Sequence, residues 1–346
     1  MNIEMTLISK SPHTSGVITG FLMLAEQGKI QLKFHTDYAH TKASYPFLHM
    51  VLVEAEGKRL VFDLLDGYNW KLEAVEALLK HTDFYFKRSF CSKKNQMISP
   101  LHRKKMHPLG FSYHVTHPHN PIDQCHGLKE RAAQLMQKIR NGSIRNAFTT
   151  ECFEAPANDK QENTILFLAR LWDMTGNKEI DIERQYINYM RIEIIRQLRK
   201  LYPNRFFGGV QFSGHALKLC RDLLIAPSKT KRVRYLDIMK QADICIGSMG
   251  LYESNGWKTG EYIAASRAIV NEALRYEVTG NFIAGKHYLP FTTPEECVAQ
   301  TVYLMEHPAF VYEMKQWNEQ YYHSYLRPDR QVAQALSVVF PGFADE

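Results

Sequence analysis

One loop in the second half of the chain carries residue types that suit the binding of an anionic ligand. From residue 247 to residue 261 it reads Gly-Ser-Met-Gly-Leu-Tyr-Glu-Ser-Asn-Gly-Trp-Lys-Thr-Gly-Glu, between a short apolar run and a helix-like segment. Gly256, Thr259 and Gly260 permit a ligand to approach backbone N–H groups where the helix begins, and the helix dipole there favours an anion such as a diphosphate. Ser248 and Lys258 add a hydroxyl group and a positive charge.

The same loop contains two carboxylates eight positions apart, Glu253 and Glu261. Glu261 lies about one turn into the predicted helix, where its carboxylate can accept hydrogen bonds from both hydroxyls of a ribose. Glu253 precedes the helix and is placed to meet a sugar attached to the diphosphate. Two glutamates at this spacing also occur on solvated helices, so the assignment depends on the glycines and Lys258 around them.

Two residues of the first half are candidates for proton transfer or acceptor binding. His13 lies in the loop that follows the strand-like segment Ile3–Ser9, where an imidazole can act as a base or contact a phosphate. Asp66 follows a second strand-like run and can bind an acceptor hydroxyl, although an Asx turn explains it equally simply. A basic segment, interpreted either as a solvated face or as phosphate and acceptor contacts, comprises Lys87, Arg88, Lys93, Lys94, Arg103, Lys104 and Lys105.

These residues require elements that bring them together. The chain begins with a strand, a helix and a strand, which is a βαβ unit, and from residue 164 to residue 270 strands and helices alternate as in a parallel sheet. At 346 residues the chain exceeds what one core usually organises. We predict an α/β fold with two Rossmann-like domains that face a cleft: 1–150, a linker at 151–163, 164–315, and C-terminal helices over 316–346 that cross back to the first domain.

The second half resembles the donor-binding half of two-domain (GT-B) glycosyltransferases, in particular the group-1 and spore-maturation-type branches. The resemblance covers roughly residues 160–310 and rests on the Glu253-x7-Glu261 spacing followed by Ala264–Val270, Gly280–Phe282 and Pro294–Glu296. It implies that Glu261 holds the nucleotide ribose, that Glu253 lies near the transferred sugar, and that the loop amides hold the diphosphate. It also implies that Arg170, after the strand-like Ile165–Ala169, contacts the diphosphate.

The resemblance therefore predicts a glycosyltransferase that moves a sugar from a nucleotide-diphosphate sugar to an acceptor, and it leaves the stereochemical course open. We expect no metal and no cofactor besides the donor, because the sequence has no Asp-x-Asp tripeptide of the kind that metal-dependent sugar transferases use. Two other interpretations stay open: a sugar-nucleotide epimerase on the same fold, and a non-catalytic binding module. A dinucleotide dehydrogenase is disfavoured because the first βα turn lacks the Gly-x-Gly-x-x-Gly fingerprint.

Charge and hydropathy restrict the location and partners. Residues 1–150 hold 20 Lys and Arg against 12 Asp and Glu, whereas the remainder holds 23 against 24. We expect a carbohydrate or glycoconjugate acceptor, with peripheral membrane contact through the basic first domain, and we disfavour nucleic acid. No N-terminal apolar run is long enough to span a bilayer, and the six cysteines form no Cys-x-x-Cys pair. We therefore expect a cytoplasmic protein with reduced thiols.

Overall fold

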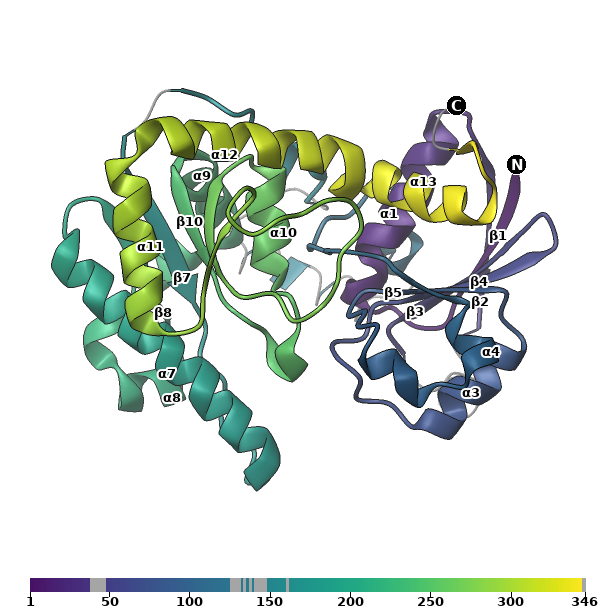
Figure 1. The fold of residues 1–346 in the computed structure, drawn as a ribbon, viewed down its shortest axis with the longest axis horizontal. Helices are drawn as coiled ribbons and strands as arrows, with labels where there is room; N and C mark the ends of the chain where they lie inside the picture. The colour runs from purple at the N-terminus through teal and green to yellow at the C-terminus, as the bar shows by residue number, and fades with distance from the viewer. Residues whose placement is uncertain are drawn as a thin grey trace.

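The computed structural model describes residues 1–37, 48–124, 148–159 and 162–343, together with residues 132, 135, 136 and 139. Within these ranges the chain forms two lobes, each built on a six-stranded sheet, and the lobes lie side by side along the long axis (Figure 1). The predicted α/β class is confirmed. The predicted linker begins inside α6 (Thr150–Phe153), and residues 160 and 161 of it lie outside the described residues, so the exact division stays a prediction.

The first sheet is mixed, with the strand order β2-β1-β3-β4-β5-β6. The predicted βαβ unit forms β1, α1 and β2, but β3 pairs antiparallel with both β1 and β4. The cause is a hairpin: Glu56 and Gly57 both have positive φ (46° and 76°), as the tight turn between β3 and β4 requires. The elements of this lobe are β1 (Asn2–Leu7), α1 (Ser15–Glu26), β2 (Gln31–Thr36), β3 (Met50–Ala55), β4 (Lys58–Asp63), α3 (Leu72–Lys80), β5 (Phe84–Lys87), α4 (Pro100–Arg103) and β6 (Met106–Pro108).

The second sheet, over residues 162–343, is parallel at every strand pair, with the order β12-β11-β10-β7-β8-β9. The strands are short apolar runs, as is usual for parallel strands covered on both faces. The order reverses between β7 and β10. The elements of this lobe are β7 (Ile165–Ala169), α7 (Lys178–Leu201), β8 (Phe206–Gln211), α8 (Gly214–Leu219), β9 (Leu224–Ile225), α9 (Arg232–Gln241), β10 (Ile244–Gly247), α10 (Trp257–Ala264), β11 (Ala268–Glu272), β12 (Leu289–Phe291) and α11 (Pro294–Glu306).

The C-terminal helices connect the lobes. Helix α12 (Pro308–Tyr321) packs on the second lobe, and α13 (Pro328–Val339) lies against α1 of the first lobe (Figure 1). The contact is close because α1 has Gly20 there: a Cβ at Gly20 would lie 2.2 Å from the carbonyl oxygen of Pro328. The predicted return of the chain to the first lobe is confirmed. None of the helices in the described ranges combines the length and apolar character that a membrane span needs.

Candidate active site in the interlobe cleft

A cleft of about 470 Å³ lies between the lobes. On the side of the second lobe it opens at the carboxyl ends of β7 and β10, where the strand order reverses, and open α/β sheets bind ligands at this place. An adjoining hollow of about 260 Å³ extends the groove past α9. The first lobe contributes His13, Asp66 and Arg88 to the cleft, and the polar contribution of the second lobe includes Arg170, Arg191, Ser248 and Lys258.

Arg170 comes directly after β7 and lines both the cleft and the hollow. Its guanidinium carbon lies 4.6 Å from the centre of the Trp172 ring, so the side chain is held by a cation–π contact. With the described residues the guanidinium makes no hydrogen bond and no ion pair. All of its N–H donors are therefore open to a ligand, and the diphosphate contact that the resemblance implies stays a prediction.

Arg191, on the inner face of α7, organises the loops around the cleft. Its guanidinium donates to the Oγ of Ser248 (3.0 Å), to the carbonyl oxygen of Arg170 (2.5 Å) and to that of Met249 (2.8 Å). Burial lowers the pKa of Arg191 to about 10, which still leaves it charged at neutral pH. Sequence reasoning missed this residue, although a signal was present: Arg191 interrupts the apolar face of α7 formed by Ile187, Met190, Ile194 and Ile195.

Lys258 lies at the start of α10 and lines the cleft. Its Nζ donates to the carbonyl oxygen of Leu168, and burial lowers its pKa to about 8. Gly256 precedes the helix, and a Cβ there would lie 2.7 Å from the carbonyl oxygen of Ser248, so glycine permits the loop to fold back on itself. Trp257 and Lys258, the first residues of α10, line the cleft, so a helix N-terminus and a cation border it together, which suits an anion. Thr259 is buried instead, and its hydroxyl donates to Asn271 (2.8 Å).

Glu261 is buried beneath the hollow and does not line either cavity. Its Oε1 accepts from Arg232 (2.7 Å) and its Oε2 from the hydroxyl of Tyr235 (2.8 Å). Arg232 and Tyr235 do line the hollow. The structure therefore places these two side chains, rather than the predicted carboxylate, on the surface that faces a ligand, and Glu261 orients them.

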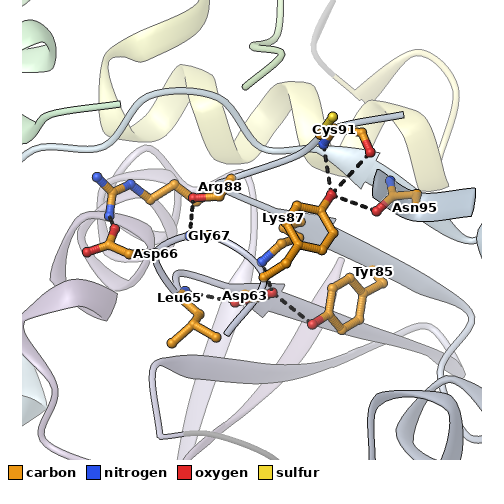
Figure 2. A network of polar contacts seen from close by, with 11 residues as sticks. Asp63, Leu65, Asp66, Gly67, Tyr85, Lys87, Arg88, Cys91 and Asn95 are labelled. Atoms are coloured by element: carbon orange, nitrogen blue, oxygen red, sulfur yellow. Dashed lines mark hydrogen bonds and ion pairs between the residues drawn. The ribbon is translucent and has the colours of Figure 1, made fainter. Parts of the chain in front are cut away.

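The first-lobe wall rests on a buried polar network (Figure 2). Asp63, at the end of β4, accepts hydrogen bonds from the hydroxyl of Tyr85 and from Nζ of Lys87, both at 2.8 Å. The next carboxylate, Asp66, points into the cleft and forms an ion pair with Arg88. Arg88 also donates to the carbonyl oxygen of Asn255 across the cleft (2.8 Å). Asp66 is thus held at the interface of the two lobes, and its predicted contact with an acceptor hydroxyl stays a prediction.

His13 lies just before α1, and its ring packs between His49 (4.4 Å between centroids) and Trp257 of the second lobe (4.8 Å). Burial, followed by the nearby His49, lowers the pKa of His13 to about 4, so the imidazole is neutral at pH 7. Its Nδ1 is buried and has no hydrogen-bond partner among the described residues. The imidazole is therefore unprotonated at neutral pH, and Asp66, whose charge favours the protonated form, lines the same cleft.

Glu253 is not brought into the cleft. It ends the turn Leu251–Glu253, in which Tyr252 and Glu253 both have positive φ (56° and 57°), an uncommon conformation for residues other than glycine. Its half-exposed carboxylate pairs with Lys94 of the first lobe at 2.8 Å. In this arrangement Glu253 links the lobes at the rim of the cleft.

The sequence matches no family model and no curated protein. Among solved structures, the chain is similar to a glycosyltransferase from Rickettsia africae ESF-5, at 10% identity and a TM-score of 0.44, covering 93% of this chain and 80% of that one. It is similar to WaaG, a glycosyltransferase involved in lipopolysaccharide biosynthesis, at 12% identity and a TM-score of 0.39. That match covers 95% of this chain and 97% of the WaaG chain. It is also similar to UDP-GlcNAc 2-epimerase from Neisseria meningitidis bound to UDP-GlcNAc, at 13% identity and a TM-score of 0.40. That match covers 77% of this chain and 64% of the epimerase chain. These likenesses are distant, so the function has to follow from the residues of the cleft.

Proposed function

We propose that this protein transfers a sugar from a nucleoside diphosphate sugar to an acceptor hydroxyl group. The observation that carries the proposal is a cationic wall facing an uncharged imidazole across one cleft: Arg170 and Lys258 on the second lobe, His13 on the first. Such a site can stabilise a departing diphosphate on one side and receive a proton on the other.

The charge around the cleft supports a diphosphate ligand. Five basic side chains and three carboxylates gather there, so the ionised site carries two positive charges in excess: Arg88, Arg170, Arg191, Arg232 and Lys258 against Asp66, Glu261 and Glu272. The diphosphate of a sugar nucleotide is doubly negative. Arg170 offers the unused donors, and the N-terminus of α10 offers backbone N–H groups.

The chemical step assigns a role to each wall. The acceptor oxygen attacks the anomeric carbon while the bond from that carbon to the diphosphate oxygen breaks, and the acceptor proton passes to His13. The negative charge that develops on the leaving diphosphate is stabilised by Arg170, Lys258 and the α10 amides. Asp66 favours the protonated form of His13, so it stabilises the imidazolium as the proton arrives.

We also infer that the reaction needs no divalent cation, because side-chain and helix charges already match the diphosphate. The acceptor is expected to be a carbohydrate or glycoconjugate, since Asp66 suits a hydroxyl group.

The test is calorimetric titration of the protein with UDP, GDP, CDP and TDP and their sugars, with and without EDTA. One diphosphate should bind, with an affinity that EDTA does not change. Product analysis follows with that donor and a set of glycans. Free diphosphate and a glycosylated acceptor would support transfer, whereas isomerisation of the donor without acceptor would indicate an epimerase. No binding of any nucleotide would overturn the proposal.

A further inference from the structure

The hollow next to the cleft shares two cationic side chains with it. Arg170 and Lys258 line both cavities, whereas His13 and Asp66 line only the cleft. Under the proposed function the diphosphate lies at the two cations, and the sugar that reacts points into the cleft toward His13. The nucleoside is attached to the other end of the diphosphate, so it has to enter the hollow.

Arg232, the first residue of α9, lines the hollow and not the cleft. Its guanidinium carbon lies close to the centres of three aromatic rings: 5.1 Å from Phe153, 5.5 Å from Tyr235 and 5.8 Å from Phe148. Its Nη2 donates to Oε1 of Glu261 at 2.7 Å. The guanidinium is therefore held in place before any ligand arrives, and binding a ligand costs it little conformational freedom.

Glu261 lies behind Arg232 and is already used within the protein. Its Oε1 accepts from Arg232 and its Oε2 accepts from the hydroxyl of Tyr235 at 2.8 Å. The residue is buried beneath these two side chains. The charged group that meets a ligand at this place is therefore a hydrogen-bond donor, Arg232, and the ligand has to supply the acceptor atoms.

A guanidinium fixed in this way favours a ligand with two acceptor atoms side by side. With the described residues Arg232 makes only the hydrogen bond to Glu261, so its other N–H donors are open to the ligand. Arginine presents these donors as a planar fork that binds two adjacent acceptors at once.

The bases of common nucleotides differ in whether they offer such a pair. Guanine has O6 beside N7, and cytosine has O2 beside N3. In uracil and thymine an N–H group separates the two carbonyl oxygens, and in adenine an amino group lies beside N1 and N7, where it would face the N–H groups of the guanidinium. A fixed arginine therefore discriminates between these two sets of bases.

We propose that Arg232 selects the base of the sugar nucleotide and that this base is guanine or cytosine. The inference rests on the proposed function, which places the nucleoside in the hollow, and it adds the class of nucleotide. A bidentate contact between arginine and such a base discriminates by roughly tenfold to a hundredfold. Glu261 is then a positioning residue that acts through Arg232.

The experiment is calorimetric titration of the full chain with GDP, CDP, UDP, TDP and ADP, and the quantity compared is the ratio of affinities within each variant. The wild type should bind GDP or CDP roughly tenfold to a hundredfold more tightly than the other three. Arg232→Lys keeps a positive charge beside Glu261 but removes the planar fork. In that variant the ratio should fall to within about threefold, while the affinity for UDP changes by less than about threefold.

Arg234→Lys is the matched control, because Arg234 is an exposed residue of the same helix that lines neither cavity, and it should keep the wild-type ratio. Glu261→Gln leaves the guanidinium without its ion pair and should lower the ratio in part, by about threefold to tenfold.

The outcomes separate this inference from the proposed function. Equal affinity for all five nucleotides, or a preference for UDP, TDP or ADP, would overturn the inference alone. So would a wild-type ratio in Arg232→Lys, or an equal loss in Arg234→Lys. If none of the five nucleotides binds, the proposed function itself fails. A preference for GDP or CDP that disappears in Arg232→Lys supports the inference, and the two titrations show which of the two bases is bound.

Discussion

The two walls of the cleft carry charge in different ways. The wall from the second lobe presents side chains that are cationic at neutral pH. Arg170 forms no ion pair with the described residues, and Arg191 is hydrogen-bonded to the loops that contain Ser248 and Arg170. The wall from the first lobe presents His13, kept neutral by burial, beside an Asp66–Arg88 pair whose charges cancel. One wall can hold an anion permanently, and the other can change its charge during a reaction.

This difference separates binding from proton transfer. A variant of the second-lobe wall should weaken nucleotide affinity, whereas a variant of the first-lobe wall should slow turnover and leave nucleotide affinity intact. If both kinds of variant changed the same quantity, the division between the walls would be wrong. Four predictions test it, in order of decreasing effect.

His13→Gln should lower kcat by roughly a hundredfold to ten-thousandfold, the usual contribution of a general base. Nucleoside diphosphate affinity should stay within about twofold, because glutamine keeps the size and polarity of the site. Steady-state kinetics and calorimetry measure the two quantities. The matched control is His114→Gln, since His114 is also a half-buried imidazole near Trp257 (5.4 Å between ring centroids) but does not line the cleft. An equal loss of kcat in both variants would indicate that His13 acts by packing on Trp257 and not by accepting a proton.

Arg170→Met should weaken nucleoside diphosphate binding by about tenfold to a hundredfold, the value of one or two charge-assisted hydrogen bonds. The free energy of unfolding should change by less than about 1 kcal/mol, because the guanidinium has only its cation–π contact with Trp172 to lose in the described structure. Calorimetry and urea denaturation measure these effects. Arg184→Met serves as the control, since the Arg184 guanidinium also lies over the Trp172 ring (5.7 Å) but does not line the cleft. A comparable loss in Arg184→Met would contradict a direct role for Arg170.

The two lobes also differ in how far the sequence predicts them. The second lobe could be predicted because parallel strands buried on both faces appear as short apolar runs between helices, from Ile165–Ala169 to Ala268–Glu272. In the first lobe the sequence shows the βαβ unit, but the antiparallel placement of β3 depends on the Glu56-Gly57 turn and on pairing between distant segments. Alternation alone does not report strand direction.

The candidate site shows the same limit. The loop sequence points to Gly256 and Lys258, and both line the cleft, because a glycine and a lysine at a helix start form a local pattern that the sequence shows directly. The partners of Glu261 could not be predicted, since Arg232 and Tyr235 approach it from α9 through tertiary packing. Likewise, the left-handed backbone at Tyr252 and Glu253 turns the latter toward Lys94, and neither residue type signals that conformation.

The pKa of Lys258, lowered to about 8 by burial, predicts a pH dependence of nucleotide binding. The ammonium charge is present below that pH and is lost above it, so affinity should fall as pH rises from 7 toward 9.5, by about tenfold at most. Calorimetry across this range measures the decline. Lys258→Arg keeps its charge over the whole range, so the decline should disappear in that variant. A decline of equal size in Lys258→Arg would assign the pH dependence to another group.

Glu253→Gln should have the smallest effect, less than about threefold on kcat and on nucleotide affinity. The carboxylate is half-exposed and pairs with Lys94, and exposed ion pairs typically contribute less than about 1 kcal/mol. Lys94→Gln removes the other partner and should give the same small change, with no further loss in the double variant. Steady-state kinetics of the three variants measure this. A loss of more than a hundredfold in kcat for Glu253→Gln alone would show that Glu253 leaves Lys94 during turnover and meets the donor sugar, and the second-lobe wall would then take part in the chemistry as well as in binding.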